Sequence, residues 1–488
     1  MKDFQYYLNN IGEIGYVARS LNSIVYISGL PKAHPNEIVI FENQEMGLVL
    51  SMDEDYLEVL VFSNFEIRVG SKVVRTDENI KVGVGEALLG RLVDPLGYPL
   101  DGKGDIENLN PVFVDIDPPK ISERKNVEKP LLTGVKIVDM VLPLGKGQRE
   151  LIIGDRKTGK TEFLLQTVIT QTKKGTVCVY AVIGQKLMDT RKLYEFFVSK
   201  GIVGNTIIVA SNSSDSPGLI FLTPYTAMTI AEFFRDKGLD VLVILDDMTT
   251  HARNYREISL LSKKFPGRNS YPGDVFYIHA KLVERAGNFN KGSITCLPVA
   301  ESVLGDLSGY IQTNLMSMTD GHIFFDIDLV SQGKRPAINP FLSVTRVGRQ
   351  TQTLLQRDVG REISEFLVTY DRMKQFMHFG AEIGDAAKNI LNLGAKLDVF
   401  FNQAEVKDAS LDLNILILGG LWAGLWSEIE VDKLKMELEQ LELLYSTDEN
   451  FKKEVDQFIG SCDNFSDIVT RLRRDNSIIL SRVRFIRK

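Results

Sequence analysis

One glycine-rich segment, Gly154–Thr161, constrains the fold of this chain more than any other feature. It reads Gly-Asp-Arg-Lys-Thr-Gly-Lys-Thr and fits the pattern G-x-x-x-x-G-K-[ST]. An apolar run, Leu151–Ile153, precedes it, and a helix-like stretch, Glu162–Thr170, follows. This context suits a phosphate-binding loop, because the backbone N–H groups of the loop and the positive end of the helix dipole both face an anion. The sequence therefore predicts binding of a nucleoside triphosphate.

Two oxygen-bearing side chains are predicted to hold Mg²⁺. In the loop, Lys160 is expected to contact the terminal phosphates and the Thr161 hydroxyl to ligate the metal. Asp246 ends the apolar run Val241–Leu245, and a parallel strand delivers its last residue to the phosphate end of such a site. An aspartate here could instead cap a helix. Beside a phosphate-binding loop, we expect it to bind the metal through a water molecule.

Hydrolysis would also need a group that activates water, and the sequence offers no carboxylate at the usual place. The strand-like run Tyr180–Ile183 leads to Gln185, whose amide can hydrogen-bond but cannot take a proton near neutral pH. A further candidate is Arg346, within Ser343–Gly348. Its planar, permanently charged guanidinium suits a γ-phosphate, although many such arginines only form surface ion pairs.

The order of patterns along the 488 residues predicts three domains. Short β-branched and aromatic runs before residue 79 indicate a small β-barrel. Strand runs then alternate with helical stretches, which is typical of a mostly parallel sheet covered by helices. Helical periodicity dominates the rest. The predicted fold is an N-terminal β-barrel (1–78), a central α/β P-loop (RecA-like) nucleotide-binding domain (79–364) and a C-terminal α-helical domain (365–488).

Composition argues against several other classes of protein. With a net charge of −7, 44% hydrophobic and 25% charged residues, the chain reads as a globular protein without the basic surplus of a nucleic-acid binder. The apolar stretch Asn414–Trp426 is shorter than the roughly 20 residues that span a bilayer, so a buried helix is expected. The three cysteines are predicted to be buried thiols, and the histidines show no zinc-ligand spacing. We expect a cytoplasmic protein without direct membrane insertion.

Several long segments resemble the alpha subunit of F-type ATP synthase. Leu282–Ala286 and Thr319–Gly321 match that family. So do the following segments: Leu89–Gly97, Asp101–Gly104, Thr133–Asp139, Gly147–Thr161, Tyr255–Ser259 and Pro272–Tyr277. One tripeptide separates the two nucleotide-binding subunits of that family. Catalytic beta chains carry Gly-Glu-Arg where this chain has Gly184-Gln185-Lys186, which is the alpha form.

The resemblance implies a non-catalytic, ATP- or ADP-binding subunit of a hexameric ring, together with Mg²⁺. It implies that Arg346 acts in trans as an arginine finger in the catalytic site of a beta-like partner, and that Ser317 and Val344 line the same interface. A central-stalk, gamma-like partner and membrane association through the larger complex are also implied, without nucleic acid. The expected contacts of the chain's own nucleotide are Arg156, Lys157, Thr158, Gly159, Lys160, Thr161, Gln185 and Asp246, with Arg335, Pro336 and Gln403 near the base.

Some positions depart from the family pattern. Lys157 stands in place of a usual glutamine, Val330 of an aromatic near the adenine, Glu405 of a second glutamine, and Arg349 of a small residue. The barrel is also expected within the first dozen residues, where family members have a longer segment that docks a peripheral stalk. These departures favour a specialised rotary-type ATPase, such as a motility motor, over the housekeeping synthase.

Two alternatives have other requirements. A self-sufficient hexameric ATPase of the secretion or flagellar type would carry glutamate at position 185. An RNA translocase resembling transcription termination factor Rho would need stacking aromatics and a basic groove on its barrel. The barrel region here is instead rich in acidic residues, among them Glu37, Glu42, Asp53 and Glu58.

Overall fold

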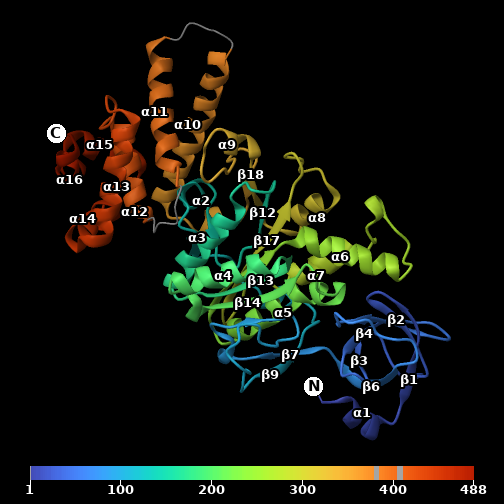
Figure 1. Cartoon of the computed structure of the whole chain (residues 1–488). Coiled ribbons are helices and arrows are strands. Elements are labelled where there is room, and N and C mark those ends of the chain that lie inside the picture. Colours follow the sequence, from blue (N-terminus) through green and yellow to red (C-terminus); the bar gives the residue numbers. More distant parts are fainter. Residues whose placement is uncertain (1, 379–383, 404–409, 488) are drawn as a thin grey trace.

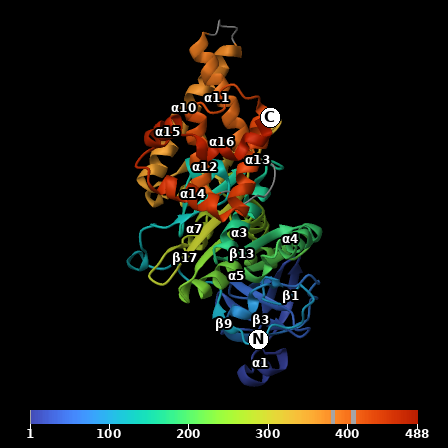
Figure 2. The ribbon, with the colours of Figure 1, turned by 90° about the vertical axis from the view of Figure 1, so that its left-hand side faces the viewer.

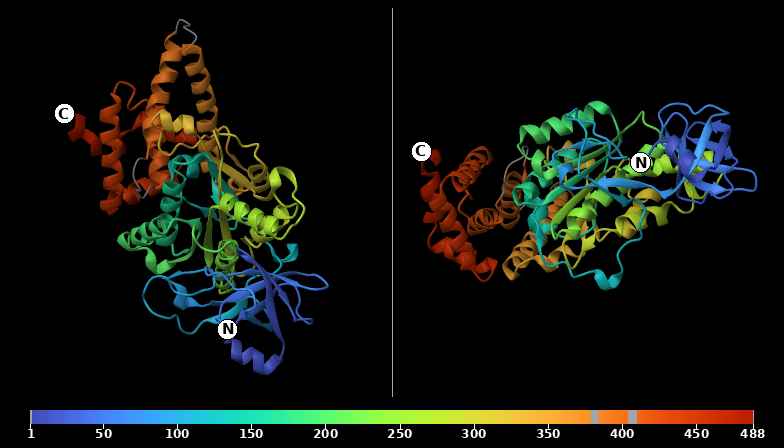
Figure 3. Two further views of the ribbon diagram at one scale, coloured as in Figure 1. Left: turned by 45° about the vertical axis from the view of Figure 1, so that its right-hand side comes forward. Right: turned by 90° about the horizontal axis from the view of Figure 1, so that it is seen from below.

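The structure is a computed structural model that describes residues 2–378, 384–403 and 410–487. A β-barrel, a central α/β unit and a group of helices follow one another along the chain (Figure 1). The barrel and the helices lie at opposite ends of an elongated molecule, and the turned views in Figure 2 and Figure 3 show the same arrangement. The predicted fold class is confirmed.

The N-terminal barrel is closed by antiparallel strands in the order β1-β2-β5-β4-β3-β6, behind a short helix. Aliphatic side chains such as Val25, Val39 and Val59 fill its interior. The barrel is joined to the central unit where the Ser216 N–H donates to Oδ1 of Asn64, 2.7 Å away. The elements are α1 (Phe4–Ile11), β1 (Ile14–Leu21), β2 (Ile24–Ser28), β3 (Glu37–Phe41), β4 (Met46–Met52), β5 (Leu57–Val61) and β6 (Lys72–Asn79).

The central sheet runs in the order β19-β18-β12-β17-β15-β13-β14-β8, and β16 pairs with β17. Its strands are parallel except for β16 and β19, which run antiparallel to their neighbours. The strands are β8 (Leu92–Val93), β12 (Glu150–Gly154), β13 (Val177–Gln185), β14 (Thr206–Asn212), β15 (Asp240–Asp246), β16 (Gly287–Asn288), β17 (Ser293–Glu301), β18 (Gly321–Phe325) and β19 (Val344–Thr345). Two smaller pairs, β7 (Lys81–Val84) with β9 (Asn110–Phe113) and β10 (Pro130–Leu131) with β11 (Leu144–Gly145), lie outside it.

Both faces of this sheet are buried, which explains why its strands read as continuous apolar runs. Along β13, Tyr180 and Val182 enter one core, whereas Val179 and Ala181 enter the other. The first core is covered by α2 (Lys136–Val141), α3 (Lys160–Lys173) and α4 (Leu187–Ser199). The second is covered by α5 (Pro217–Asp236), α6 (Met248–Leu261), α7 (Val275–Val283) and α8 (Tyr310–Met318).

Helix α5 contains a proline in its interior. The helix begins at Pro217, and Pro224 lies inside it. Ser216 caps the helix by accepting a hydrogen bond from the Leu219 N–H, and Pro217 is the first helical residue, where its missing N–H costs nothing. These signals outweigh the interior proline.

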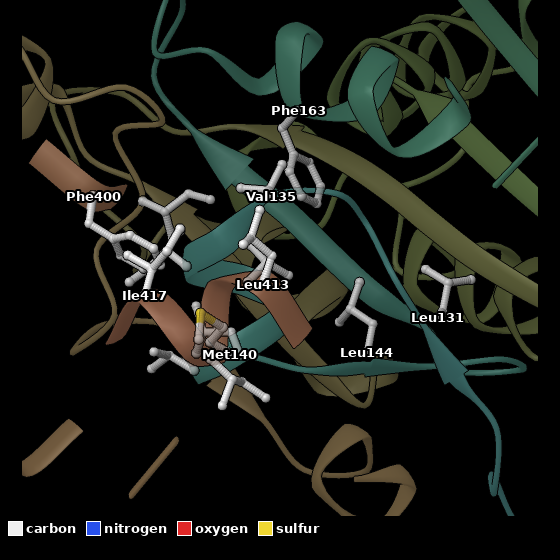
Figure 4. Close-up of a cluster of buried hydrophobic side chains, with 14 of the residues drawn as sticks. Leu131, Val135, Met140, Leu144, Phe163, Phe400, Leu413 and Ile417 are labelled. Atoms are coloured by element: carbon white, nitrogen blue, oxygen red, sulfur yellow. The ribbon is translucent and has the colours of Figure 1, made fainter. Parts of the chain in front are cut away.

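The C-terminal helices share a continuous core with the central unit. Figure 4 shows Val135 and Met140 close to Leu413 and Ile417, which come from the helical region. The helices are α10 (Leu354–His378), α11 (Asp385–Phe401), α12 (Leu411–Ala423), α13 (Val431–Thr447), α14 (Glu449–Gly460), α15 (Phe465–Arg474) and α16 (Ser477–Arg487), with the short α9 (Ile327–Ser331) before them. Residue 365, the predicted domain boundary, lies within the unbroken helix α10.

The apolar stretch around Ile417 forms α12, and Leu413–Leu421 are all buried there. Within the described parts of the chain, no helix has the length and apolar character required to cross a membrane.

Candidate functional site

The phosphate-binding loop connects β12 to α3, as the sequence predicted. Gly159 adopts φ 97° immediately before the helix begins at Lys160, and Lys157 adopts φ 62°. The Lys160 ammonium folds over the loop and donates to the carbonyl oxygens of Gly154 and Asp155, each 2.7 Å away. Burial lowers the pKa of Lys160, and the nearby carboxylates of Glu301, Asp246 and Asp247 oppose that shift. The loop therefore presents a cation, and the amino end of α3, to an anion.

Asp246 lies at the carboxyl end of β15, close enough to the loop to influence Lys160 electrostatically. Its Oδ2 accepts a 2.8 Å hydrogen bond from the Tyr180 hydroxyl, and its backbone carbonyl accepts one from Nε2 of Gln185 at 3.2 Å. Burial raises the pKa of Asp246, and these donors counteract the shift. The structure thus brings together Lys160, Asp246 and Gln185.

These residues can accommodate Mg²⁺. The Thr161 hydroxyl is exposed in the first turn of α3, and Asp246 supplies a carboxylate. Hard oxygen ligands of this kind are those that Mg²⁺ prefers. Asp247 has a different task, because it caps α6 by accepting from the Thr250 N–H at 2.6 Å. Burial raises the pKa of Asp247 to about 6.

Arg156 forms an ion pair with a residue that the sequence reasoning missed. Its guanidinium makes a two-pronged ion pair with Glu301, with Nε 2.8 Å from Oε1 and Nη2 3.1 Å from Oε2. Glu301 is the last residue of β17, which lies between β12 and β15. The signal was present: an apolar strand that ends in a carboxylate, the same pattern that identified Asp246.

The residues expected near the base lie together at the junction with the helical domain. The Gln403 N–H donates to the carbonyl of Arg335, and the Gln403 side chain bridges the Lys136 N–H (2.7 Å) and the Gly134 carbonyl (3.1 Å). Arg335 and Pro336 line a cavity of about 830 Å³ between α9 and the helices α10 and α11. Glu405, which stands in place of a family glutamine, lies outside the described residues.

Arg346 lies at the opposite end of the sheet from the phosphate-binding loop. It follows β19, whose Thr345 pairs with Gly321; Gly321 pairs in turn with Glu150, the first residue of β12. The loop begins at Gly154, which pairs with Phe325 and lies four residues after Glu150 along β12. At ~3.3 Å per residue, the level of Arg346 and the start of the loop are about 13 Å apart along the strands. An arginine side chain is shorter than this separation.

The surroundings of Arg346 are open. In the regions that the structure describes, its exposed guanidinium has no hydrogen bond or ion pair. The other two residues predicted beside it, Ser317 at the end of α8 and Val344 on β19, are also exposed. Ser317 lies three residues before Asp320, whose carbonyl accepts the Arg346 N–H. These three residues form a surface separate from the nucleotide site.

Two of the segments that resemble the family contain a buried charged residue that makes hydrogen bonds or an ion pair within the protein. In Thr133–Asp139, the buried Asp139 carboxylate accepts from the backbone N–H groups of Thr133 and Gly134 and from the Thr133 hydroxyl, and burial raises its pKa to about 6. In Leu282–Ala286, the buried Arg285 forms an ion pair with Glu232. The first group fixes the turn before α2, and the second ties the segment after α7 to α5.

Comparisons with known proteins agree with this architecture. The model of the nucleotide-binding domain of the ATP synthase alpha/beta family matches residues 134–345, and that of the C-terminal domain of the same family matches residues 352–469. The chain is 38% identical to ATP synthase subunit alpha of Orientia tsutsugamushi (strain Ikeda), over 88% of this chain and 86% of that protein. The corresponding protein of Neorickettsia sennetsu (strain ATCC VR-367 / Miyayama) is 39% identical over 86% and 85%. That of Petrotoga mobilis (strain DSM 10674 / SJ95) is 37% identical over 98% and 96%.

Proposed function

Because the chain belongs to the ATP synthase alpha/beta family, we propose that it is a non-catalytic, alpha-type subunit of a hexameric rotary ATPase. In this role it binds Mg²⁺ with ATP or ADP at its own phosphate-binding loop. It donates Arg346 to the catalytic site of a beta-like partner. The alpha-type assignment starts from the resemblance of the sequence to alpha chains, in particular from the tripeptide Gly184-Gln185-Lys186.

The observation that carries the proposal is the position of Arg346. A residue at the end of the sheet opposite to its own loop, with an exposed guanidinium, cannot serve its own nucleotide but can serve that of a neighbour. A guanidinium supplied in trans stabilises the charge that develops on the transferred phosphoryl group.

The chain's own site lacks the group that would activate water. Gln185 takes the usual place of the carboxylate, and its amide is engaged with the backbone of Asp246. Lys160 and the amino end of α3 would hold the phosphates, and Thr161 and Asp246 would hold the metal. A magnesium ion there would neutralise phosphate charge. Bound nucleotide would therefore stabilise or regulate the ring rather than turn over.

The ring would contain a beta-like chain and a central-stalk, gamma-like chain, and would reach a membrane only through other subunits. Lys157, Val330 and Arg349 depart from the family pattern, which supports a specialised complex such as a motility motor over the housekeeping synthase.

The test is to purify the complex from its native source and identify its chains. We expect a partner that carries Gly-Glu-Arg at the position of Gly184-Gln185-Lys186, and ATP turnover that requires both chains. Full turnover by the purified chain alone would contradict the proposal.

A further inference from the structure

Glu301 places a carboxylate beside the phosphate-binding loop. In the parallel register of the sheet it pairs with Gly154, the first residue of that loop. Two helices fix its backbone: the Glu301 N–H donates to Oγ1 of Thr249 on α6 at 2.9 Å, and its carbonyl accepts from Nε2 of Gln312 on α8. The position of this carboxylate is therefore set by the fold and not by a mobile loop.

Two arginines hold the Glu301 carboxylate. Arg156, a residue of the loop itself, makes the two-pronged ion pair, and Nη2 of Arg253 lies 3.6 Å from Oε2. The Glu301 side chain is 17% exposed, whereas that of Arg156 is 73% exposed. The carboxylate is thus the more buried partner of the pair.

A nucleotide that binds at the loop would lie near the negative charge of Glu301. Glu301 acts on the same Lys160 that faces the phosphates, together with Asp246 and Asp247. A nucleoside triphosphate without metal carries more negative charge than its magnesium complex, so a nearby carboxylate repels the metal-free form more strongly. Arg156 offsets part of that repulsion.

We propose that Glu301, held by Arg156, makes the chain's own nucleotide site selective for the magnesium complex over the metal-free nucleotide. This assignment rests on the proposed function, since it presumes that the loop binds nucleotide. One unit charge acting on another across ~7 Å at an effective dielectric constant of ~20 changes affinity by roughly tenfold or more.

The experiment measures the affinity of the purified full-length chain for ATP by isothermal titration calorimetry, once with Mg²⁺ and once with EDTA. The readout is the dissociation constant in EDTA divided by the dissociation constant with Mg²⁺. In Glu301→Gln we expect this ratio to fall about tenfold, chiefly because ATP binds more tightly in EDTA. In Arg156→Gln we expect the ratio to rise, because the charge of the Glu301 carboxylate is then less compensated. The double variant should resemble Glu301→Gln.

The matched control is Glu195→Gln, which removes the same charge from an exposed position of α4 outside the phosphate-binding loop. Its ratio should equal that of the wild type. An unchanged ratio in Glu301→Gln, or an equal change in Glu195→Gln, would overturn the role of Glu301 while leaving nucleotide binding intact. If Glu301→Gln does not fold, an unchanged or lower ratio in Arg156→Gln overturns the role of Glu301 instead. A wild-type chain that binds ATP in neither condition overturns the proposed function itself.

Discussion

The backbone N–H of Arg346 donates a 3.3 Å hydrogen bond to the carbonyl of Asp320, which holds the arginine at the end of the sheet away from the phosphate-binding loop. The Asp320 carboxylate also binds Arg149, with Oδ1 2.7 Å from Nη2 and Oδ2 2.9 Å from the backbone N–H. Arg149 immediately precedes β12. One aspartate therefore ties the strand that leads to the loop to the segment that presents Arg346.

Replacing Arg346 with alanine should reduce ATP turnover of the assembled complex by about 10³–10⁵, the effect of removing a trans-acting arginine in related phosphoryl-transfer enzymes. Nucleotide binding at this chain's own loop should not change, because the two sites lie at opposite ends of the sheet. Steady-state turnover and nucleotide titration of the same preparation provide the measurement. Arg349→Ala, an exposed arginine three residues away, is the control and should retain activity within severalfold. Equal losses in both variants would contradict the finger role.

Replacing Lys160 with alanine should empty this chain's nucleotide site, because the substitution removes the cation that faces the phosphates. Assembly or regulation of the complex should suffer, while the partner's chemistry continues. Bound nucleotide per ring, measured after rapid desalting, and initial turnover check the two expectations separately. Lys174→Ala, at the far end of α3, is the control. Complete loss of turnover in an intact Lys160→Ala ring with the partner's site occupied would show that this chain is itself catalytic.

A buried histidine pair should make the fold sensitive to acid. Nδ1 of His251 lies 3.0 Å from Nε2 of His279, and Nε2 of His251 lies 3.0 Å from the Phe221 carbonyl. Burial lowers the pKa of His251 from 6.5 to about 4 and lowers that of His279 as well. Between pH 6.5 and 4 the unfolded chain therefore binds more protons than the folded one, and the free energy of unfolding falls as the pH falls. Each of the two imidazole groups contributes up to about 1.4 kcal/mol to this change in the free energy of unfolding per pH unit.

The measurement is urea unfolding at several pH values, compared with a His251→Gln/His279→Gln variant. The comparison is needed because Asp247, whose pKa is raised to about 6, contributes with the opposite sign. The variant should show a shallower loss of stability over this pH range. Parallel curves for the two proteins would mean that the pair does not titrate on unfolding.

Lys136 should stabilise the junction between the central unit and the helical domain. It is 5% exposed, and its ammonium donates to Oε1 of Glu442 at 2.7 Å and to the carbonyl of Phe400 at 3.2 Å. Lys136→Met should lower the free energy of unfolding by about 2 kcal/mol, since hydrogen bonds that involve a charged group contribute about this much. Chemical denaturation measures this change in the free energy of unfolding. The control is Lys433→Met, at an exposed position of α13. A loss no larger than that of the control would show that the contact is not stabilising.

The local elements could be derived from the sequence because their causes are local. The loop pattern around Lys160, the apolar runs that became β13 and β15, and the buried character of α12 all follow from residue type and spacing. The beginning of α5 could not be derived from periodicity alone, because the cap at Ser216 and the first helical residue Pro217 decide it. The pairing of Arg156 with Glu301 joins residues 145 positions apart, so no local pattern contains it.

By itself, the sequence determined the chemistry available to this protein: a phosphate-binding loop, an aspartate at the end of a strand, and an amide at position 185. Only the tertiary structure decided where those groups lie relative to one another. Strand order places Glu301 beside the loop, and strand register sends Arg346 to the other end of the sheet, because pairing between distant segments sets both.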